Sequence, residues 1–249
     1  MFFRKSKEPD PPLHVIITGA SDGVGLELAR LYATAGCDVV ATGRQLIRDE
    51  SAHFAFSNIT YVRADQARPE EAARLVTSAI RRKGWSTVNR LILNAAVGTF
   101  GDPAEEGRSQ TVAQVDINFA GPVMMARLLA DDLFAANGRL VLIGSKAQKG
   151  APKFATYAAT KAALSGLARS LRSEWKGRAK VLILHPGPIR TSMHKKAGLK
   201  TGVAGLFFVR PRRAARAWFA AIEAGRKDLK MGWWRSMRKG YFPAKKVKP

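Results

Sequence analysis

Cysteine and long apolar runs are both scarce in this chain. Cys37 is the single cysteine among 249 residues, which excludes an internal disulfide and favours a reducing compartment. No apolar stretch reaches the roughly 18 residues that a membrane-spanning helix needs. The first residues, Met-Phe-Phe-Arg-Lys-Ser-Lys, lack the long apolar segment of a signal peptide. These absences predict a cytoplasmic protein.

Acidic residues are also few. Asp and Glu number 19 against 42 Lys and Arg, which gives a formal net charge of +23. Residues 190–249 alone contain 17 basic residues and two acids, a net charge of +15. Such a surface suits an anionic partner: a phosphate-bearing cofactor, an anionic membrane, an acidic carrier protein or nucleic acid. A basic surface can also simply keep the protein soluble, and this explains the scattered charges better than a partner does. For the C-terminal cluster, solubility and an anionic partner both stay open.

What the chain does contain is an alternation of two patterns. Hydrophobic residues make up 46% of it, enough for a sizeable core. Strand-like apolar runs alternate with helical periodicity, which predicts one doubly wound α/β domain with a mostly parallel, seven-stranded sheet flanked by helices. The six recognisable strands are expected at 13–17, 37–42, 59–65, 88–93, 139–143 and 180–185, and the helices at 24–35, 69–83, 109–133, 156–176 and 211–224.

A glycine-rich turn joins the first strand to the first helix. It reads Thr18-Gly-Ala-Ser-Asp-Gly-Val-Gly25. Gly19 permits a sharp turn, Gly23 removes a side chain where a pyrophosphate would approach, and Gly25 lets the helix pack on the strand. The N–H groups at the start of that helix would face the anion. The turn and its neighbours Ser21, Asp22 and Val24 therefore predict a dinucleotide site.

The ends of the second and third strands bear on the choice of dinucleotide. An acid after the second strand would accept hydrogen bonds from the adenosine ribose, but Arg44 stands there and suits a 2′-phosphate. This favours NADP(H) over NAD, although Asp22 is a mild counter-signal and Arg44 could be a plain surface arginine. Asp65 could bond the adenine amino group or could begin the turn before Pro69.

Later strand ends and one helix carry further signals. Small residues in Asn94-Ala-Ala-Val97 would let a cofactor approach the backbone. Asn118 followed by Gly-Pro is unfavourable inside a helix and indicates a kink, either functional or structural. The rigid turn at Pro186-Gly187 lies where open α/β sheets bind ligands. Residues 192–208 contain three glycines and no clear period, which suggests a lid.

The stretch from Ser145 to Lys161 carries the candidate chemistry. Tyr157 and Lys161 are four positions apart, so they share one face of a helix. A free phenol has a pKa of about 10, and a nearby ammonium lowers it toward the range that acid/base work near neutral pH requires. Ser145, at the end of a strand, could hydrogen-bond a substrate oxygen. The alternative is a surface tyrosine and lysine on an ordinary helix.

With these residues together, the chain resembles the classical short-chain dehydrogenase/reductase (SDR) family, whose fold is of the Rossmann type. The resemblance covers residues 13 to about 225. It leaves a basic, aromatic N-terminal extension (1–12) and a basic, aromatic tail (226–249). The motifs that carry it, in chain order, are Thr18-Gly19-x-x-x-Gly23-x-Gly25, Asp65, Asn94-Ala95-Ala96, Asn118, Ser145, Tyr157-x-x-x-Lys161 and Pro186-Gly187.

The resemblance implies a role for each matching residue. Tyr157 would be the acid/base, Lys161 would lower its pKa and hold the nicotinamide ribose, and Ser145 would orient the substrate oxygen. Asn118 would support a water that relays protons to Lys161. The residues expected to contact the dinucleotide are Gly19, Ser21, Asp22, Gly23, Val24, Gly25, Arg44, Asp65, Asn94, Ala95, Ala96, Tyr157, Lys161, Pro186, Gly187, Ile189 and Thr191.

The implied activity is that of an NADP(H)-dependent carbonyl reductase or alcohol dehydrogenase without a metal. The alternative is a catalytically silent dinucleotide-binding scaffold. Three departures from the family pattern stand out. Asn-Ala-Ala replaces the usual Asn-Ala-Gly, so Ala96 could crowd the cofactor. Ser145 and Tyr157 are twelve positions apart, one fewer than expected. The tail does not resemble the short last strand of many soluble members.

The two ends leave the partners open. Residues 226–249 contain nine basic residues interleaved with Trp233, Trp234, Tyr241 and Phe242, a composition that suits an anionic, inner-face membrane surface and a lipophilic substrate. The alternatives are packing over the pocket or at a homodimer or homotetramer interface. Nucleic acid is disfavoured because no base-reading module is visible. An acidic acyl carrier protein could meet the lid lysines Lys195, Lys196 and Lys200.

Overall fold

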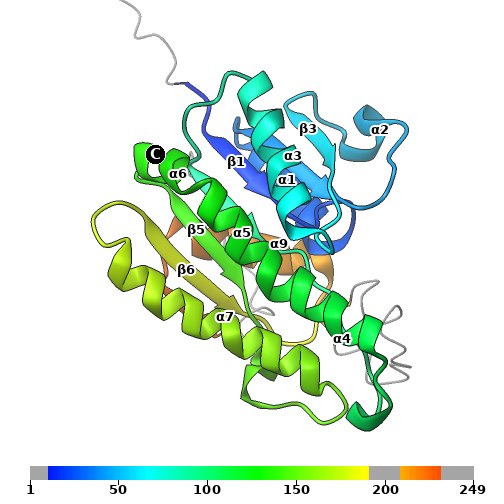
Figure 1. Cartoon of the computed structure of the whole chain (residues 1–249). Coiled ribbons are helices and arrows are strands. Elements are labelled where there is room, and N and C mark those ends of the chain that lie inside the picture. The colour runs from blue at the N-terminus through cyan, green and yellow to red at the C-terminus, as the bar shows by residue number, and fades with distance from the viewer. Residues whose placement is uncertain (1–10, 191–207, 231–249) are drawn as a thin grey trace, which may run out of the picture.

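The computed structural model describes residues 11–190 and 208–230, which form a parallel sheet covered by helices on both faces (Figure 1). The sheet has seven strands in the order β3-β2-β1-β4-β5-β6-β7, and every adjacent pair is parallel. This confirms the predicted fold class. The strands are β1 (His14–Ile17), β2 (Asp38–Gly43), β3 (Ile59–Arg63), β4 (Arg90–Leu93), β5 (Arg139–Ile143), β6 (Lys180–His185) and β7 (Asp228–Lys230).

Two apolar layers hold the helices on the sheet. On one face α1 (Gly23–Thr34) and α9 (Pro211–Glu223) pack together over the inner strands. On the other face lie α3 (Pro69–Arg82), α5 (Gly121–Leu128) and α7 (Ala155–Glu174). Figure 1 shows α5 and α7 in front of the strands and α9 behind them. Helices cover both faces of the sheet, so side chains that point to either face are shielded from water. This explains the continuous Val/Ile/Leu runs of the central strands.

Strand order places the binding edge. The chain leaves β1 toward β2 on one side, whereas β4 lies on the other side of β1. In open α/β sheets, ligands bind beyond the carboxyl ends of the strands at this point of reversal. The glycine-rich turn, Arg44, Asp65, Asn94 and Ser145 all follow the carboxyl end of a strand, so the topology gathers them at one edge.

The helix expected at 109–133 is broken. It consists of α4 (Arg108–Val115), a π-helical turn η2 (Asp116–Ala120), α5 and α6 (Ala130–Ala135). The π turn contains Asn118, where the sequence predicted a kink, and the backbone stays helical through it. Such π turns frequently occur at functional sites. The short helix α2 (Glu50–Phe54) and the 3₁₀ turns η1 (Pro103–Glu105) and η3 (Lys146–Lys149) were not predicted.

The last strand corrects the sequence analysis. A seventh strand was predicted but not located, and residues 226–249 did not resemble a short final strand; Asp228–Lys230 nevertheless pairs parallel with Ile183–His185 as β7. A three-residue strand with two charged residues has no apolar pattern to announce it. Backbone pairing with β6 creates it, and that pairing depends on where α9 returns the chain.

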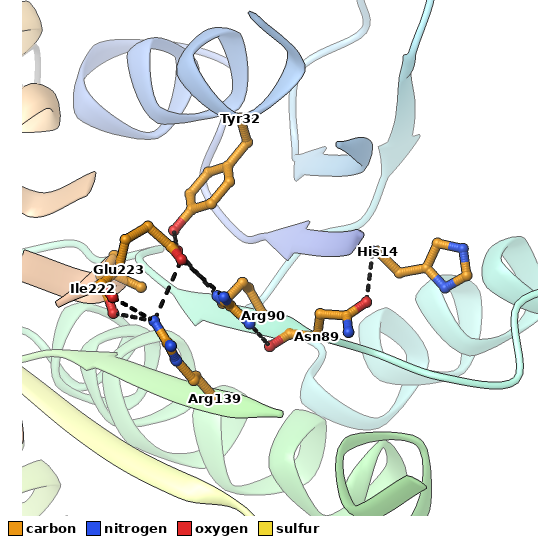
Figure 2. Close-up of polar contacts among 7 residues, drawn as sticks. All are labelled: His14, Tyr32, Asn89, Arg90, Arg139, Ile222 and Glu223. Atoms are coloured by element: carbon orange, nitrogen blue, oxygen red, sulfur yellow. Dashed lines mark hydrogen bonds and ion pairs between the residues drawn. The ribbon is translucent and has the colours of Figure 1, made fainter. Parts of the chain in front are cut away.

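A buried charged cluster lies at the opposite, amino-terminal edge of the sheet. Glu223, at the end of α9, accepts hydrogen bonds from Arg90 Nη2 at 2.8 Å, Arg90 Nε at 3.0 Å and Tyr32 Oη at 2.8 Å. Arg139 Nη1 lies 3.3 Å from the same carboxylate and also donates to the carbonyl of Ile222 at 2.6 Å. Figure 2 shows these side chains converging from α1, β4, β5 and α9. The cluster ties α9 to the sheet far from the binding edge.

Candidate active site

A cavity of about 780 Å³ opens at the carboxyl edge of the sheet. Its walls come from the segments that follow β1 to β6 and from the start of α7. The predicted residues that line it are Gly19, Ser21, Asp22, Gly23, Val24, Arg44, Asp65, Asn94, Ala95, Ala96, Ser145, Tyr157, Lys161, Pro186, Gly187 and Ile189. The fold therefore brings together residues that are spread over 170 positions of sequence, from 19 to 189.

The glycine-rich turn is built by close backbone contacts. Gly19 and Gly23 have φ angles of +64° and +61°, a region that glycine enters without strain. A Cβ on Gly19 would lie 2.7 Å from the Cα of Ala95, and one on Gly25 would lie 2.2 Å from the carbonyl oxygen of Gly19. Side chains at either position would push the turn away from β4 and α1.

Asn94 holds this turn in place. Its Nδ2 donates to the carbonyls of Thr18 and Gly19, both at 3.0 Å, while its backbone N–H donates to Thr18 Oγ1 at 3.0 Å. Asn94 lines the cavity, yet its amide nitrogen is engaged by the turn. We therefore assign Asn94 the task of fixing the shape of the glycine-rich turn. Gly23 and Val24, the first residues of α1, line the cavity, so the positive end of the helix dipole faces it.

The ends of β2 and β3 form the far wall. Arg44 is exposed there beside Gly43, and Arg63 donates to its backbone carbonyl at 3.3 Å. Two guanidinium groups thus lie near this wall. Asp65 is exposed and its Oδ1 accepts from Ala67 N at 3.0 Å, so it does begin a turn while it lines the cavity. Both readings of Asp65 from the sequence remain compatible with its position.

Tyr157, Lys161 and Ser145 meet at the inner end of the cavity. Lys161 Nζ lies 5.7 Å from the centre of the Tyr157 ring and donates to the carbonyl of Ile143 at 2.8 Å. Ser145 Oγ accepts from Ala147 N at 3.1 Å and is close enough to Tyr157 to influence its pKa. Lys161 is 2% exposed, which makes it a lysine buried with one carbonyl partner among the described residues.

Burial governs the protonation of this pair. It raises the pKa of Tyr157, and the nearby Ser145 hydroxyl acts in the opposite direction. It lowers the pKa of Lys161 to about 7. This differs from the expectation that Lys161 lowers the pKa of Tyr157. Loss of hydration penalises both charged forms, so near neutral pH the phenol keeps its proton and the amine is only partly charged. A protonated phenol beside Ser145 can deliver a proton to an oxygen.

Asn118 lies behind the pair and does not line the cavity. It is fully buried, and its side chain accepts from Val97 N at 2.9 Å and donates to Val97 O at 2.8 Å and to Thr160 Oγ1 at 3.1 Å. Thr160 in turn donates to the backbone carbonyl of Tyr157 at 2.8 Å. The amide of Asn118 thus joins the segment after β4 to α7. The water relay expected from it stays a prediction.

Several predicted features lie outside the described residues. These are Thr191, nearly all of the lid at 192–208, the lysines at 195, 196 and 200, the N-terminal residues 1–10 and the tail after 230. Phe208 is described and lines the cavity. Within residues 11–190 and 208–230, no group of three or more His, Cys, Asp or Glu side chains could hold a metal ion, and no helix is long and apolar enough to cross a membrane.

The sequence analysis missed residues that shape the cavity around Tyr157. A Cβ on Gly98 would lie 3.2 Å from the Tyr157 ring, and the Phe154 ring packs 5.9 Å from it, centre to centre. Trp218, on α9, contributes to the wall from the opposite face of the sheet. Gly98 and Phe154 lie close in sequence to predicted residues, which is the signal that could have found them. Nothing local marks Trp218, because the helix that carries it merely looks amphipathic.

Comparison with known proteins fits this geometry. A family model described as short chain dehydrogenase matches residues 13–201. The 11-beta-hydroxysteroid dehydrogenase 1A of Arabidopsis thaliana is 33% identical over 186 residues, which are 72% of this chain and 53% of that protein. The chain thus spans about half the length of this relative.

Solved structures show the same fold. A short chain dehydrogenase/reductase family protein superposes with a TM-score of 0.76 at 28% identity, covering 89% of this chain and 96% of that one. An alcohol dehydrogenase of the archaeon Thermococcus sibiricus, complexed with 5-hydroxy-NADP, superposes with a TM-score of 0.78 at 21% identity. It covers 93% of this chain and all of the other.

Proposed function

The chain belongs to the short-chain dehydrogenase family, and from this premise we propose that it is an NADP(H)-dependent oxidoreductase that interconverts a ketone or aldehyde and an alcohol. The observation that carries the proposal is the meeting of Tyr157, Ser145 and Lys161 in one cavity with the glycine-rich turn. A dinucleotide site and a proton donor that open into the same space are what a hydride-transfer enzyme requires.

The residues present fit a dinucleotide. The glycine-rich turn offers backbone without side chains at Gly19 and Gly23, and the start of α1 offers free N–H groups to a pyrophosphate. Arg44, exposed on the wall after β2, suits the 2′-phosphate that distinguishes NADP(H). When bound, the reduced nicotinamide supplies a hydride to the carbonyl carbon.

The chain's own groups handle the oxygen and its proton. Ser145 would hold the carbonyl oxygen, and Tyr157 Oη would donate a proton to it, so that the carbonyl becomes a hydroxyl group. Lys161, with a pKa near 7, is partly protonated near neutral pH, and its positive charge would stabilise the phenolate that remains. In the oxidative direction the phenolate would accept the alcohol proton instead.

The cavity walls suggest the substrate class. They include Val97, Ala151, Pro152, Phe208 and Phe154, whose ring packs against that of Tyr157. Apolar walls favour a substrate with a hydrophobic body and few charges. The similarity to a hydroxysteroid dehydrogenase is compatible with such a lipophilic carbonyl compound. An acyl-carrier-linked substrate is the alternative within this proposal.

Replacement of Tyr157 tests the reaction. Tyr157→Phe keeps the ring and removes the proton donor, so NADPH oxidation with a lipophilic ketone should fall by about 10²–10⁴-fold while NADPH still binds. Tyr32→Phe, at the other edge of the sheet, is the matched control and should keep its turnover. If wild-type protein binds NADPH but reduces no aldehyde or ketone in a broad panel, the silent scaffold replaces the enzyme.

Peripheral membrane binding through the basic tail is a second proposal. Its support is compositional: nine basic residues and four large aromatic ones in 226–249. Deletion of 231–249 is the right test, because Asp228–Lys230 belongs to the sheet. The full chain should sediment with anionic liposomes and the deletion variant should not. Equal bound fractions of the two proteins would rule out membrane binding through the tail.

The predicted homodimer or homotetramer is a separate question, which light scattering of the full chain would test.

A further inference from the structure

The position of Tyr157 depends on a short loop that lies against its ring. This loop, residues 97–101, passes so close that a Cβ on Gly98 would lie 3.2 Å from Cδ2 of Tyr157. Phe100 on the loop packs against Phe154 with ring centres 5.1 Å apart, and Phe154 packs against Tyr157. Any movement of the loop would therefore move the phenol or the wall beside it.

Hydrogen bonds fix the loop at two points. Asn118 holds its first residue, Val97, through both backbone groups. Gln114 holds its middle: Gln114 Oε1 accepts from Thr99 N at 3.3 Å, and Gln114 Nε2 lies 3.4 Å from Thr99 Oγ1. Gln114 is 1% exposed, so these bonds are shielded from water.

Glu106 connects this second point to the catalytic helix. One carboxylate oxygen accepts from Gln114 Nε2, and the other accepts from Thr156 Oγ1 at 2.6 Å. Thr156 directly precedes Tyr157 in the first turn of α7. Glu106 comes from the turn before α4, and its side chain joins α4 directly to the start of α7; through Gln114 it is connected to the loop 97–101.

We propose that Glu106, bridging Thr156 and Gln114, is a positioning residue that sets the spacing between Tyr157 and the loop 97–101. The inference rests on the proposed function and extends it to residues that no family motif includes. Both partners donate to Glu106, so a carboxylate is the group required. A glutamine at 106 would remove the charge that strengthens both bonds, and its NH₂ would have to face either Gln114 Nε2, a second donor, or the Thr156 hydroxyl, which would then have to accept.

The chain offers a sharp set of variants. Thr156→Val removes one donor at nearly constant volume, and Thr156→Ser keeps the hydroxyl. Glu106→Gln weakens the bridge by removing its charge, and adding Gln114→Glu returns a carboxylate to the pair on the other side. Glu105→Gln, at an exposed neighbouring position outside this network, removes the same charge and serves as the control.

Turnover and hydrogen exchange are both measured. Thr156→Val and Glu106→Gln should lower kcat for the carbonyl substrate about ten- to hundredfold, as misplaced catalytic groups do, with the Kd for NADPH unchanged within about twofold. Amide exchange in 97–101 and 155–161 should become faster. Thr156→Ser, Glu105→Gln and the Glu106→Gln/Gln114→Glu pair should stay near wild type.

The two readouts separate the possible failures. Faster exchange with kcat kept within about threefold in Thr156→Val, or a paired variant no better than Glu106→Gln, would overturn the proposal. If the wild type reduces no carbonyl compound, the proposed function fails, and hydrogen exchange alone then decides: unchanged exchange in Thr156→Val overturns the positioning role and faster exchange supports it. Should Glu106→Gln fail to fold, the Thr156 pair of variants still gives the answer.

Discussion

Removing the carboxylate of Glu223 should cost a large part of the protein's stability. Glu223 is the acid to which Arg90 and Arg139 both donate, and the side chains of these arginines are 2% and 12% exposed. Glu223→Ala would remove the carboxylate that these two guanidinium groups share, and a guanidinium does not lose its proton in a protein to relieve the loss. Breaking a buried pair in this way costs about 3–5 kcal/mol.

That magnitude is measurable. A typical domain is stable by only about 5–15 kcal/mol, and for a chain of this size each kcal/mol lowers Tm by about 2–4 °C. Glu223→Ala should thus lower Tm by roughly 6–20 °C. The control is Glu71→Ala, which breaks a 3.3 Å pair with Arg68 whose side chains are 56% and 75% exposed. It should cost no more than about 1 kcal/mol.

Urea denaturation measures the free energy of unfolding, and a second variant tests whether the buried charge is the cause of the loss. Replacing both Arg90 and Glu223 by methionine removes the more deeply buried arginine together with its carboxylate and leaves only Arg139, which is 12% exposed, so it should cost less than Glu223→Ala alone. NADPH binding would remain in every folded variant, because the cluster lies at the opposite edge from the cavity. If Glu223→Ala and Glu71→Ala differ by less than about 1 kcal/mol, the reasoning from burial is wrong.

Three further outcomes follow from the site. Burial lowers the pKa of Lys161 to about 7, and an anionic ligand favours its charged form, so NADPH affinity should fall as pH rises above about 7. Calorimetry should detect proton uptake on NADPH binding to the wild type and none on binding to Lys161→Met. Arg44→Ala should raise the KM for NADPH far more than that for NADH, and equal effects would remove the 2′-phosphate assignment. Gly25→Ala should abolish NADPH binding, since its Cβ would lie 2.2 Å from the Gly19 carbonyl, whereas Gly166→Ala on α7 has room for a methyl group and should bind normally in the same fluorescence titration.

The same lysine links pH to folding. Its folded-state pKa lies below its value of 10.5 in the unfolded chain, so unfolding takes up a proton between pH 7 and about 10. Lys161 thereby makes the ligand-free protein more stable as pH rises through this window, and stability is lost as pH falls toward 7. A bound anionic dinucleotide would act in the opposite direction, because it would favour the charged amine.

Local signals in the sequence determined much of the architecture. Continuous Val/Ile/Leu runs predicted six buried parallel strands because such strands meet no water on either face. Glycines at 19, 23 and 25 predicted the turn because only they allow its φ angles and contacts. The conflict of Asn118 with Gly-Pro predicted a kink where the π turn lies. The four-residue spacing of Tyr157 and Lys161 placed both on one helix face.

The tertiary structure alone decided what depends on distant partners. Arg90 is a charged residue at the start of an otherwise apolar strand, and no neighbour in the sequence explains why a charge lies there. The carboxylate that it binds belongs to Glu223, 133 positions away on α9. β7 has no pattern of its own and exists by pairing with β6. The pKa of Lys161 is lowered because segments distant in the sequence bury its amine when the protein folds. Propensity and periodicity are properties of a segment, whereas desolvation, ion pairing and strand pairing arise only when separate segments meet.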